Sequence, residues 1–250
     1  MAVSTGGGIL MDERAHQRPE YLLSPEHACP YLPGKRARTL FLDPASAHPP
    51  AYAELLREGF RRSGAYYYRP ECAGCQACIP LRIPVNEFAP DRSQRRTWQR
   101  NRDLDVRSVP AGYRGEHFAL YRRYLAWKHP GAGMDEGSPE DYMSFLMGPE
   151  GRTCMVEMRL HDELVAVALM DLADDGLSAV YTFYTPAWPA RSFGTFSILW
   201  EIFEARRRGL AWLYLGYWIA ASPKMAYKNR FCPHEILISR GWQRISRTRR

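Results

Sequence analysis

The chain has 250 residues and a mass of 28.8 kDa, and 46% of its residues are hydrophobic and 24% charged. This balance is typical of a packed globular protein and excludes a disordered or fibrous chain. The net charge is +7, and only four of the 34 basic residues are lysine. Arginine binds phosphate through paired hydrogen bonds and stacks on bases, so this excess suits an RNA partner, although a GC-rich genome produces the same bias. The longest apolar run, residues 211–221, falls short of the roughly 20 residues that cross a bilayer, so we expect no membrane partner.

Residues 1–20 lack the basic start and long apolar stretch of a secretory signal, so we expect a flexible leader and a cytoplasmic protein. The chain then divides near residue 110. Residues 21–110 are predicted to form a smaller lobe of short elements, because four prolines between positions 70 and 90 interrupt its second half. The expected elements are a strand at 39–43, a helix at 51–60, a strand at 65–69, a cysteine-rich loop and a strand at 79–85.

Residues 111–250 carry longer and more regular patterns. A helix at 115–128 has an apolar side, and a second helix begins after Ser138, where Pro139 and Asp141 are typical first-turn residues. Three strands joined by short turns are predicted next, at 153–160, 163–172 and 177–186. They are followed by a helix at 193–208, a buried strand at 211–219, a short helix at 224–231 and one or two strands near 236–245.

The order helix, helix, three antiparallel strands, helix, strand, helix, strand is that of the GNAT acyltransferase fold, an analogy at the level of fold alone. The predicted fold class is therefore α+β, with a GNAT-like acyltransferase lobe (an antiparallel sheet with flanking helices) and a smaller α+β N-lobe. Acetyl-CoA enzymes of this fold hold a pyrophosphate at a glycine-rich helix start. Residues 191–196 read RSFGTF at that place, and we expect Phe196 to crowd a pyrophosphate, which disfavours acetyl-CoA as a donor.

Three of the six cysteines form a single C-x-x-C-x-x-C run at Cys72, Cys75 and Cys78. This spacing is typical of a structural zinc site or an iron–sulfur cluster, with Cys29 as the candidate fourth ligand and His27 as a substitute for a thiolate in either site. A reduced loop without metal is the other interpretation. We expect no disulfides, because the chain shows no secretory signal.

Six segments carry long and unusual sequences in a fixed order: CPYLPGKRARTLFLDP (29–44), GFRRSGAYYYRPECAGCQACIPLRIPV (59–85), RSQRRTWQRNRDLDV (92–106), LSAVYTFY (177–184), YLGYWI (214–219) and KMAYK (224–228). In these segments the chain resembles the family of bacterial aspartate/glutamate leucyltransferases, relatives of the eukaryotic arginyl-tRNA–protein transferases. Three positions depart from the family pattern: Thr185 stands where an acidic residue is usual, Ser222 where Cys is frequent and Phe193 where Leu is common. An acidic role at position 185 is therefore not expected.

The resemblance implies transfer of leucine from leucyl-tRNA to the α-amine of acceptor proteins that begin with Asp or Glu, which creates an N-degron for protein degradation. This chemistry requires no cofactor, because the aminoacyl ester is already activated and an α-amine with a pKa of about 8 is partly neutral in the cell. The enzyme must align the amine with the ester, stabilise the oxyanion and relay a proton. No Ser/His/Asp set and no GxSxG sequence points to a hydrolase instead.

The implied reaction requires three groups of residues, and residue type and spacing supply the candidates for each. The cations expected to bind the acidic side chain of the acceptor are Arg61, Arg62, Lys224 and Lys228. The groups expected at the reaction centre are Asp171, Tyr181, Tyr184, Tyr217 and Tyr227. The arginines expected to bind tRNA phosphates from one side of a helix are Arg92, Arg95, Arg96 and Arg100.

Each group also has a plain structural interpretation. The arginines fit solvated surfaces, the tyrosines fit core positions with a hydroxyl at the rim, and Asp171 fits the start of a turn. Lys224 and Lys228 are four residues apart on a predicted short helix, where two like charges repel unless they share an anion.

Three other functions remain open at this point. An arginyl-tRNA–protein transferase would need a buried acid for its donor, and several acids are available. A CoA-dependent N-acyltransferase is disfavoured by the sequence at 191–196. A non-catalytic tRNA-binding module would use the arginines and a metal site, but it gives no purpose to the tyrosine-rich second half of the chain.

Reversal of charge at Arg95 and Arg96 tests the tRNA assignment. We expect the double variant Arg95→Glu and Arg96→Glu to weaken tRNA binding and to lower the salt dependence of what remains, because phosphate contacts release counterions. A filter-binding titration at low salt measures both. Unchanged binding would remove these arginines from the RNA-binding surface.

Overall fold

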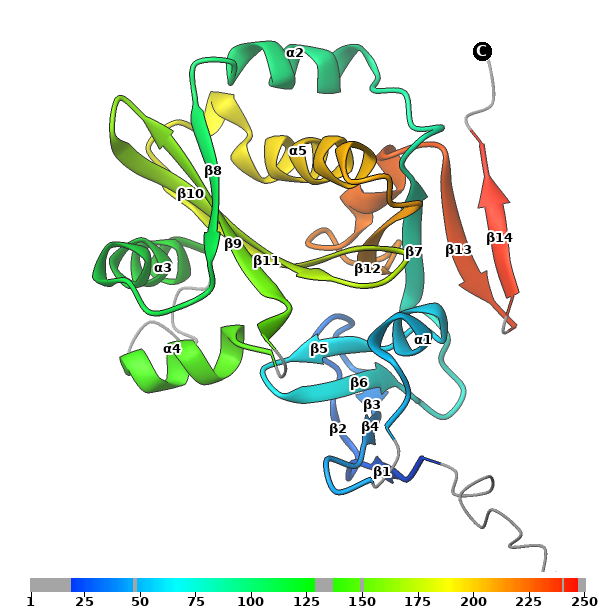
Figure 1. Cartoon of the computed structure of the whole chain (residues 1–250). Helices are drawn as coiled ribbons and strands as arrows, with labels where there is room; N and C mark the ends of the chain where they lie inside the picture. Colours follow the sequence, from blue (N-terminus) through cyan, green and yellow to red (C-terminus); the bar gives the residue numbers. More distant parts are fainter. Residues whose placement is uncertain (1–18, 47–48, 129–136, 149–150, 240, 247–250) are drawn as a thin grey trace, which may run out of the picture.

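The computed structural model describes residues 19–46, 49–128, 137–148, 151–239 and 241–246 (Figure 1). Residues 1–18 of the predicted leader lie outside these ranges. A large eight-stranded sheet forms the centre of the molecule, and a smaller four-stranded sheet packs against one of its ends (Figure 1). The predicted α+β class and the predicted order of elements after residue 111 are both confirmed.

The large sheet has the strand order β14 (Gly241–Ile245), β13 (His234–Ile238), β7 (Ile79–Pro84), β12 (Trp212–Trp218), β11 (Gly176–Tyr184), β10 (Glu163–Leu172), β9 (Thr153–Leu160) and β8 (Asp105–Pro110). All neighbours are antiparallel except β11 and β12, which are parallel. Strands β7 and β8, whose residues the sequence prediction placed in the smaller lobe, belong to the large sheet. The division into lobes near residue 110 stays a prediction.

The small sheet has the order β1 (Tyr21–Leu23), β4 (Thr39–Leu42), β6 (Tyr66–Pro70) and β5 (Arg61–Ser63), with helix α1 (Tyr52–Arg57) between β4 and β5 in the chain. Strands β2 (His27–Ala28) and β3 (Arg36–Ala37) form a separate pair beside it (Figure 1).

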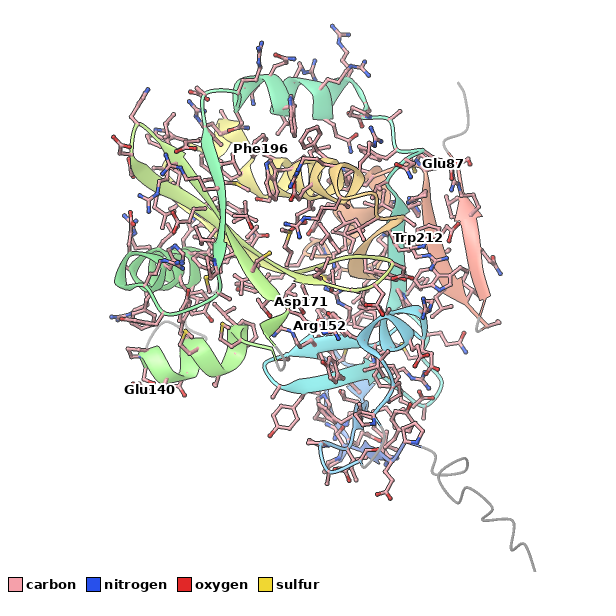
Figure 2. All side chains as sticks on the ribbon, in the orientation of Figure 1. Glu87, Glu140, Arg152, Asp171, Phe196 and Trp212 are labelled. Atoms are coloured by element: carbon pink, nitrogen blue, oxygen red, sulfur yellow. The ribbon has the colours of Figure 1, made fainter. Side chains whose placement is uncertain are left out.

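Helices cover both faces of the large sheet. Helix α5 (Phe193–Arg207) packs on one face under α2 (Arg92–Arg100), and α3 (Gly115–Lys128) and α4 (Pro139–Leu146) pack on the other (Figure 1). Strand β10 therefore buries both of its faces, which explains its almost uninterrupted apolar sequence (Figure 2). Among the described residues, no helix combines the length and the apolar character that crossing a membrane requires.

Local sequence signals fix several element boundaries. Asp91 accepts a hydrogen bond from the backbone N–H of Gln94 at 2.8 Å and caps α2, and Ser138 caps α4 through Asp141 in the same way. The turn between β9 and β10 places two consecutive residues at positive φ, as a two-residue hairpin requires.

The two parallel strands of the large sheet pair over a short length only. Residues 176–178 of β11 face residues 212–214 of β12, and no further pairing joins the two strands within the described residues. Gly216 lies at a register shift on β12, at φ +80°, a conformation that favours glycine. Beyond this point the strands diverge, and the opening between them defines the place of the candidate site.

Candidate functional site

A cavity of about 750 Å³ lies where β11 and β12 diverge. Its walls come from β11, β12, β5, the C-terminal end of α3, the start of α5 and the short 3-10 helix η5 (Ala226–Arg230). Aromatic side chains form one part of the wall: Tyr124, Trp127, Phe145, Tyr181, Tyr184 and Trp188. Cations form another part: Arg61, Arg62, Lys128, Lys224 and Lys228. The cavity thus joins an apolar region to a positively charged one.

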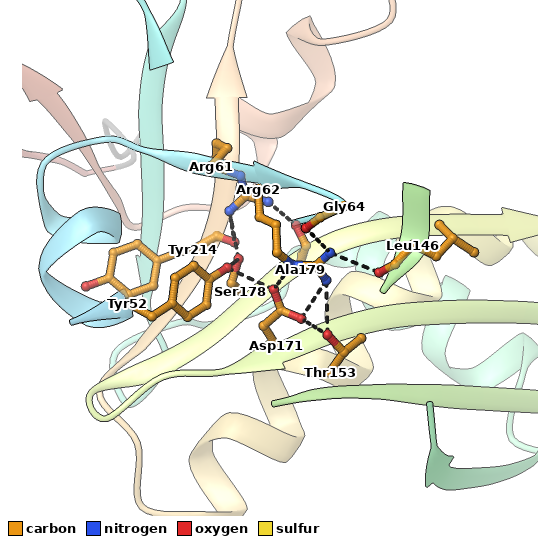
Figure 3. Close-up of polar contacts among 10 residues, drawn as sticks. All are labelled: Tyr52, Arg61, Arg62, Gly64, Leu146, Thr153, Asp171, Ser178, Ala179 and Tyr214. Carbon is orange, nitrogen blue, oxygen red and sulfur yellow. Dashed lines mark hydrogen bonds and ion pairs between the residues drawn. The ribbon is translucent and has the colours of Figure 1, made fainter. Parts of the chain in front are cut away.

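Arg61 closes the floor of the cavity at the point where the two strands diverge. Its Nη1 donates to Ser178 Oγ at 3.0 Å and to Tyr214 O at 3.3 Å, and its Nη2 donates to Ala179 O (Figure 3). Two of these acceptors are backbone carbonyls of β11 and β12 at the end of the paired stretch, and buried carbonyls require a donor. A Cβ on Gly216 would lie 3.1 Å from Arg61 Nε, so glycine is needed for close approach. Arg61 therefore holds the divergent strands in place and also faces the cavity.

Arg62 and Asp171 pair with each other in the interior. Arg62 Nε and Nη2 donate to the two carboxylate oxygens of Asp171, each at 2.7 Å, and the two side chains are only 2% and 3% exposed. The remaining N–H groups of Arg62 donate to Gly64 O, Leu146 O and Thr153 Oγ1 (Figure 3). All five donors of the guanidinium thus have an acceptor.

Asp171 is likewise fully engaged. It accepts from Thr153 Oγ1 at 2.6 Å and from the Tyr52 hydroxyl at 3.0 Å, in addition to Arg62 (Figure 3). Its carboxylate is not among the groups that line the cavity. The structure therefore gives the predicted anion-binding Arg62 and the predicted catalytic Asp171 a structural set of contacts that links β5 to β10.

Lys224 and Lys228 both line the cavity, as a shared anionic ligand would require. Lys228 is 8% exposed, and its Nζ donates to Tyr217 O at 2.9 Å. Burial, together with the charge of Arg61, lowers the pKa of Lys228 to about 7. Lys224 is exposed at the rim and precedes η5, so the two lysines share a cavity rather than one face of a regular helix.

The four predicted tyrosines come together on the cavity wall. Tyr124 packs against two of them: its ring is tilted against that of Tyr184, with centroids 5.1 Å apart, and lies edge-on to that of Tyr181 at 6.3 Å. Tyr217 directs its hydroxyl toward the small sheet: it donates to Gly59 O, just before β5, at 2.9 Å and lies 3.2 Å from Tyr68 O in β6. Burial raises the pKa of Tyr181 and Tyr184, which keeps both hydroxyls protonated at neutral pH. The tyrosines can thus donate hydrogen bonds into the cavity but cannot serve as bases.

Tyr227 completes this set from η5. It lines the cavity with 38% of its surface exposed. Its pKa is raised, first by desolvation and then by the negative charge of Glu201. Tyr227 and Glu201 are therefore neighbours in the cavity.

Glu201 is a cavity residue that the sequence prediction missed. It projects from α5, is 1% exposed, and neither of its carboxylate oxygens has a hydrogen-bond partner among the described residues. Burial raises its pKa to about 8. The available signal was helical spacing, since Glu201 lies one turn after the buried Ser197 and Ile198 and one turn before Ala205.

The predicted arginine side of residues 92–100 is confirmed as a helix, and Arg92, Arg95, Arg96 and Arg100 are all exposed on it. Arg100 donates to Ala190 O, in the segment whose residues Trp188 and Ser192 line the cavity. These four arginines, called the arginine stripe below, thus lie on a helix that contacts the cavity rim.

Phe196 does not enter the cavity. It packs between α5 and α2 against Trp98, with ring centroids 5.4 Å apart (Figure 2). The expectation that its ring crowds a ligand at the start of α5 is therefore wrong, because the ring belongs to the core beneath α2.

The four cysteines near the small sheet are half-buried and form no disulfide. Burial raises the pKa of Cys78 to about 12, and Cys29, Cys72 and Cys75 contribute to this rise, so the four thiols lie near one another. Within the described part of the chain, however, no three His, Cys, Asp or Glu side chains are arranged as a ligand set. His27 is exposed on β2, with Nδ1 3.2 Å from Pro25 O.

Comparison with known proteins identifies relatives along most of the chain. Residues 27–96 match the family model described as arginine-tRNA-protein transferase, N terminus, and residues 116–238 match the model for its C terminus. An aspartate/glutamate leucyltransferase of Thiobacillus denitrificans is 47% identical over 93% of this chain and 98% of its own length. Proteins of the same name from Nitrosococcus oceani and Stenotrophomonas maltophilia are 48% and 50% identical, over 92% and 87% of this chain and 97% and 89% of their own lengths. The solved structure of L-PGS from Bacillus licheniformis has a TM-score of 0.44 at 13% identity, over 57% of this chain and 46% of that chain.

The raised pKa of Glu201 predicts a pH-dependent cost to stability. Between the unfolded pKa of 4.5 and the folded pKa of about 8, the unfolded state releases a proton that the folded state retains, so stability falls as pH rises. We expect Glu201→Gln to match the wild type near pH 4 and to be more stable at pH 7, by on the order of 3 kcal/mol. Urea denaturation at the two pH values measures the difference.

Glu204 on the same helix provides the matched control. Its pKa is lowered by hydrogen bonds from Arg207 and Arg208, so Glu204→Gln is expected to be less stable than the wild type at pH 7. A Glu201→Gln variant that loses stability at pH 7 as Glu204→Gln does would contradict the assignment of an unpaired carboxyl.

Proposed function

The chain belongs to the arginine-tRNA–protein transferase family, and we propose that it transfers leucine from leucyl-tRNA to the α-amine of proteins that begin with Asp or Glu. Relatives at 47–50% identity carry the name aspartate/glutamate leucyltransferase. The observation that carries the proposal is the cavity between β11 and β12, which joins buried cations to an aromatic wall. We infer that this occurs in the cytoplasm, where charged tRNA is made, and that the new N-terminal leucine marks the acceptor for degradation.

Lys228 supports the preference for an acidic acceptor. Its ammonium is buried and its pKa is about 7, so a carboxylate bound beside it restores the charged form. Such a pair is shielded from water and therefore strong. Lys224 at the rim adds a second positive charge to the same path.

The aromatic wall supports binding of the donor. Trp127, 46% exposed at the end of α3, lies edge-on to Tyr184 with ring centroids 6.0 Å apart. An exposed indole at a cavity rim can stack on an unpaired base such as the last base of tRNA. The arginine stripe of α2 then contacts phosphates of the acceptor stem, and the leucyl side chain contacts the aromatic wall inside.

The reaction requires few catalytic groups, because the ester is already activated. The amine attacks the ester carbonyl, and donors must stabilise the resulting oxyanion. Tyr184 and Tyr227 present hydroxyls that stay protonated at neutral pH, so they fit this role. Tyr217 instead fixes the small sheet through Gly59 and shapes the wall.

Arginine is the alternative donor that one observation favours. The buried and unpaired Glu201 carboxyl in the cavity could pair with a guanidinium. The names of the relatives specify leucine and therefore disfavour arginine as the donor amino acid.

A transfer assay with purified protein distinguishes these possibilities. The donors are leucyl-, arginyl- and phenylalanyl-tRNA, and the acceptor peptides begin with Asp, Glu, Arg or Met. We expect leucine to appear on the Asp and Glu peptides only. Lys228→Met should lower kcat/KM for these peptides at least tenfold, whereas Lys35→Met, at an exposed position outside the cavity, should not change it.

Other outcomes have separate meanings. Transfer of arginine would keep the reaction and change the donor. Binding of tRNA without any transfer would leave a non-catalytic RNA-binding module.

We also propose that the thiols of Cys29, Cys72, Cys75 and Cys78 hold a structural zinc ion or an iron–sulfur cluster. The Cys78 thiol, whose pKa is raised by burial and by the three other thiols beside it, gains from a cation, because a bound metal stabilises thiolates. Metal analysis of protein purified without oxygen should find zinc or iron in a one-to-one ratio or above, and Cys75→Ser should reduce it. Protein free of both metals would contradict the proposal.

A further inference from the structure

We propose that Glu201 binds the α-ammonium group of the acceptor residue and takes the proton that this group must lose before the amine can attack the leucyl ester. The inference rests on the proposed function and assigns a catalytic base for it.

Glu201 differs from the other buried acids of the described chain in having no partner. Asp171 pairs with Arg62, Glu157 with His117 and Arg159, and Glu204 with Arg207 and Arg208. Both oxygens of Glu201 lack a hydrogen bond, although the side chain is 1% exposed. Burial of a carboxyl without a partner destabilises the fold. A bound ligand that supplies the missing partner gives a physical reason for the presence of such a group.

The position of Glu201 makes that ligand a bound substrate. Its side chain reaches the cavity from α5. Arg61 acts on Glu201 electrostatically, but the Arg61 guanidinium donates to carbonyls of β11 and β12 and forms no ion pair with Glu201. The carboxyl is thus held near the cavity floor and is free to accept a donor from inside the cavity.

The surrounding charges match an acidic N-terminal residue. Such a residue carries an ammonium group and a carboxylate a few bonds apart. Arg61 acts on both Glu201 and Lys228, so a negative and a positive group lie in the same part of the cavity. Glu201 fits the ammonium and Lys228 fits the side-chain carboxylate. The ammonium of the leucyl donor is the other source of the same chemistry, but it brings no carboxylate for Lys228.

The proton balance requires such a group. The acceptor ammonium gives one proton to the Glu201 carboxylate, and the neutral amine forms the C–N bond to the ester carbonyl. As the C–O bond to the tRNA ribose breaks, the amine nitrogen loses its second proton to the departing ribose oxygen. Glu201 finally releases its own proton to water. The tyrosine hydroxyls cannot take the first proton, since they are protonated donors at neutral pH.

The acidity of Glu201 suits this transfer. Its pKa of about 8 is close to that of a free α-amine, about 7.7–8.0, so the proton moves between groups of nearly equal affinity. The groups that act on Glu201 or are acted on by it are Arg61 from β5, Tyr227 from η5 and Cys154 from β9. Lys228, whose pKa is about 7, lies in the same part of the cavity and is present in both the wild type and Glu201→Gln, so the difference between their pH profiles belongs to Glu201 and the amine.

The test compares Glu201→Gln with the matched control Glu204→Gln in two measurements. In the transfer assay, Glu201→Gln should lower kcat/KM by about 10²–10⁴-fold at pH 7, the usual contribution of a positioned base. The loss should shrink as pH rises above 9, where the amine is neutral without help. Glu204→Gln should keep wild-type activity at every pH. Circular dichroism and urea denaturation serve to check that both variants are folded.

The second measurement does not depend on transfer. Wild-type protein should bind a peptide with a free N-terminal Asp more tightly than the same peptide acetylated at its N-terminus, and Glu201→Gln should lose this preference. Binding of leucyl-tRNA relative to N-acetyl-leucyl-tRNA should not change. If the variant instead loses discrimination between the two tRNAs, Glu201 binds the donor and the proposal is overturned.

Two further results would also overturn it: a loss of activity that is equal at all pH values, and a preference for the free amine that survives in Glu201→Gln. If the wild type transfers no amino acid, the proposed function fails, and the peptide-binding comparison still decides whether Glu201 binds an ammonium group.

Discussion

Two consecutive arginines on one short strand hold the two sheets together. Arg62 reaches β10 and forms a buried ion pair with Asp171, while Arg61 reaches β11 and β12. Loss of one partner of such a pair typically costs about 3–5 kcal/mol, because it leaves a buried charge without compensation. Tyr52 joins the two contacts, since its hydroxyl donates to Asp171 and lies 3.1 Å from the hydroxyl of Ser178, the residue that also accepts from Arg61 (Figure 3). The shape of the cavity therefore depends on this one polar network.

The cavity contains two buried ionisable groups that form no ion pair among the described residues, whereas the other buried acids are paired. Burial raises the pKa of Glu201 to about 8 and lowers that of Lys228 to about 7, so it favours the neutral form of both groups. A ligand with only one charge would stabilise one of them and leave the other as it is. A ligand with an ammonium and a carboxylate would restore both charges at once. The cavity is in this sense complementary to the acidic acceptor of the proposed function.

The sequence predicted the elements that have long hydrophobic patterns. Strands β9 to β11, helices α3 and α5 and their order followed from periodicity alone, and the arginine helix α2 from its side chains. The strand at Arg61–Ser63 was missed because it is short and reads as a turn between a helix and a strand. The fate of Arg62 could not be read from the sequence, since its acceptors include Leu146, Thr153 and Asp171, about a hundred residues away. Glu201 was missed although its helical spacing placed it on the buried side.

The segment between β11 and α5 couples the arginine stripe to the cavity. Arg100 of α2 donates to Ala190 O, and Arg191 donates back to Arg100 O and pairs with Asp103 at 2.7 Å. The same segment contributes Trp188 and Ser192 to the cavity wall. Contacts in both directions fix the segment against α2, so a polyanion on the stripe lies in a set position relative to the cavity. In the proposed function, an acceptor stem bound there would bring its single-stranded end toward the rim where Trp127 is exposed and would orient the ester before the acceptor arrives.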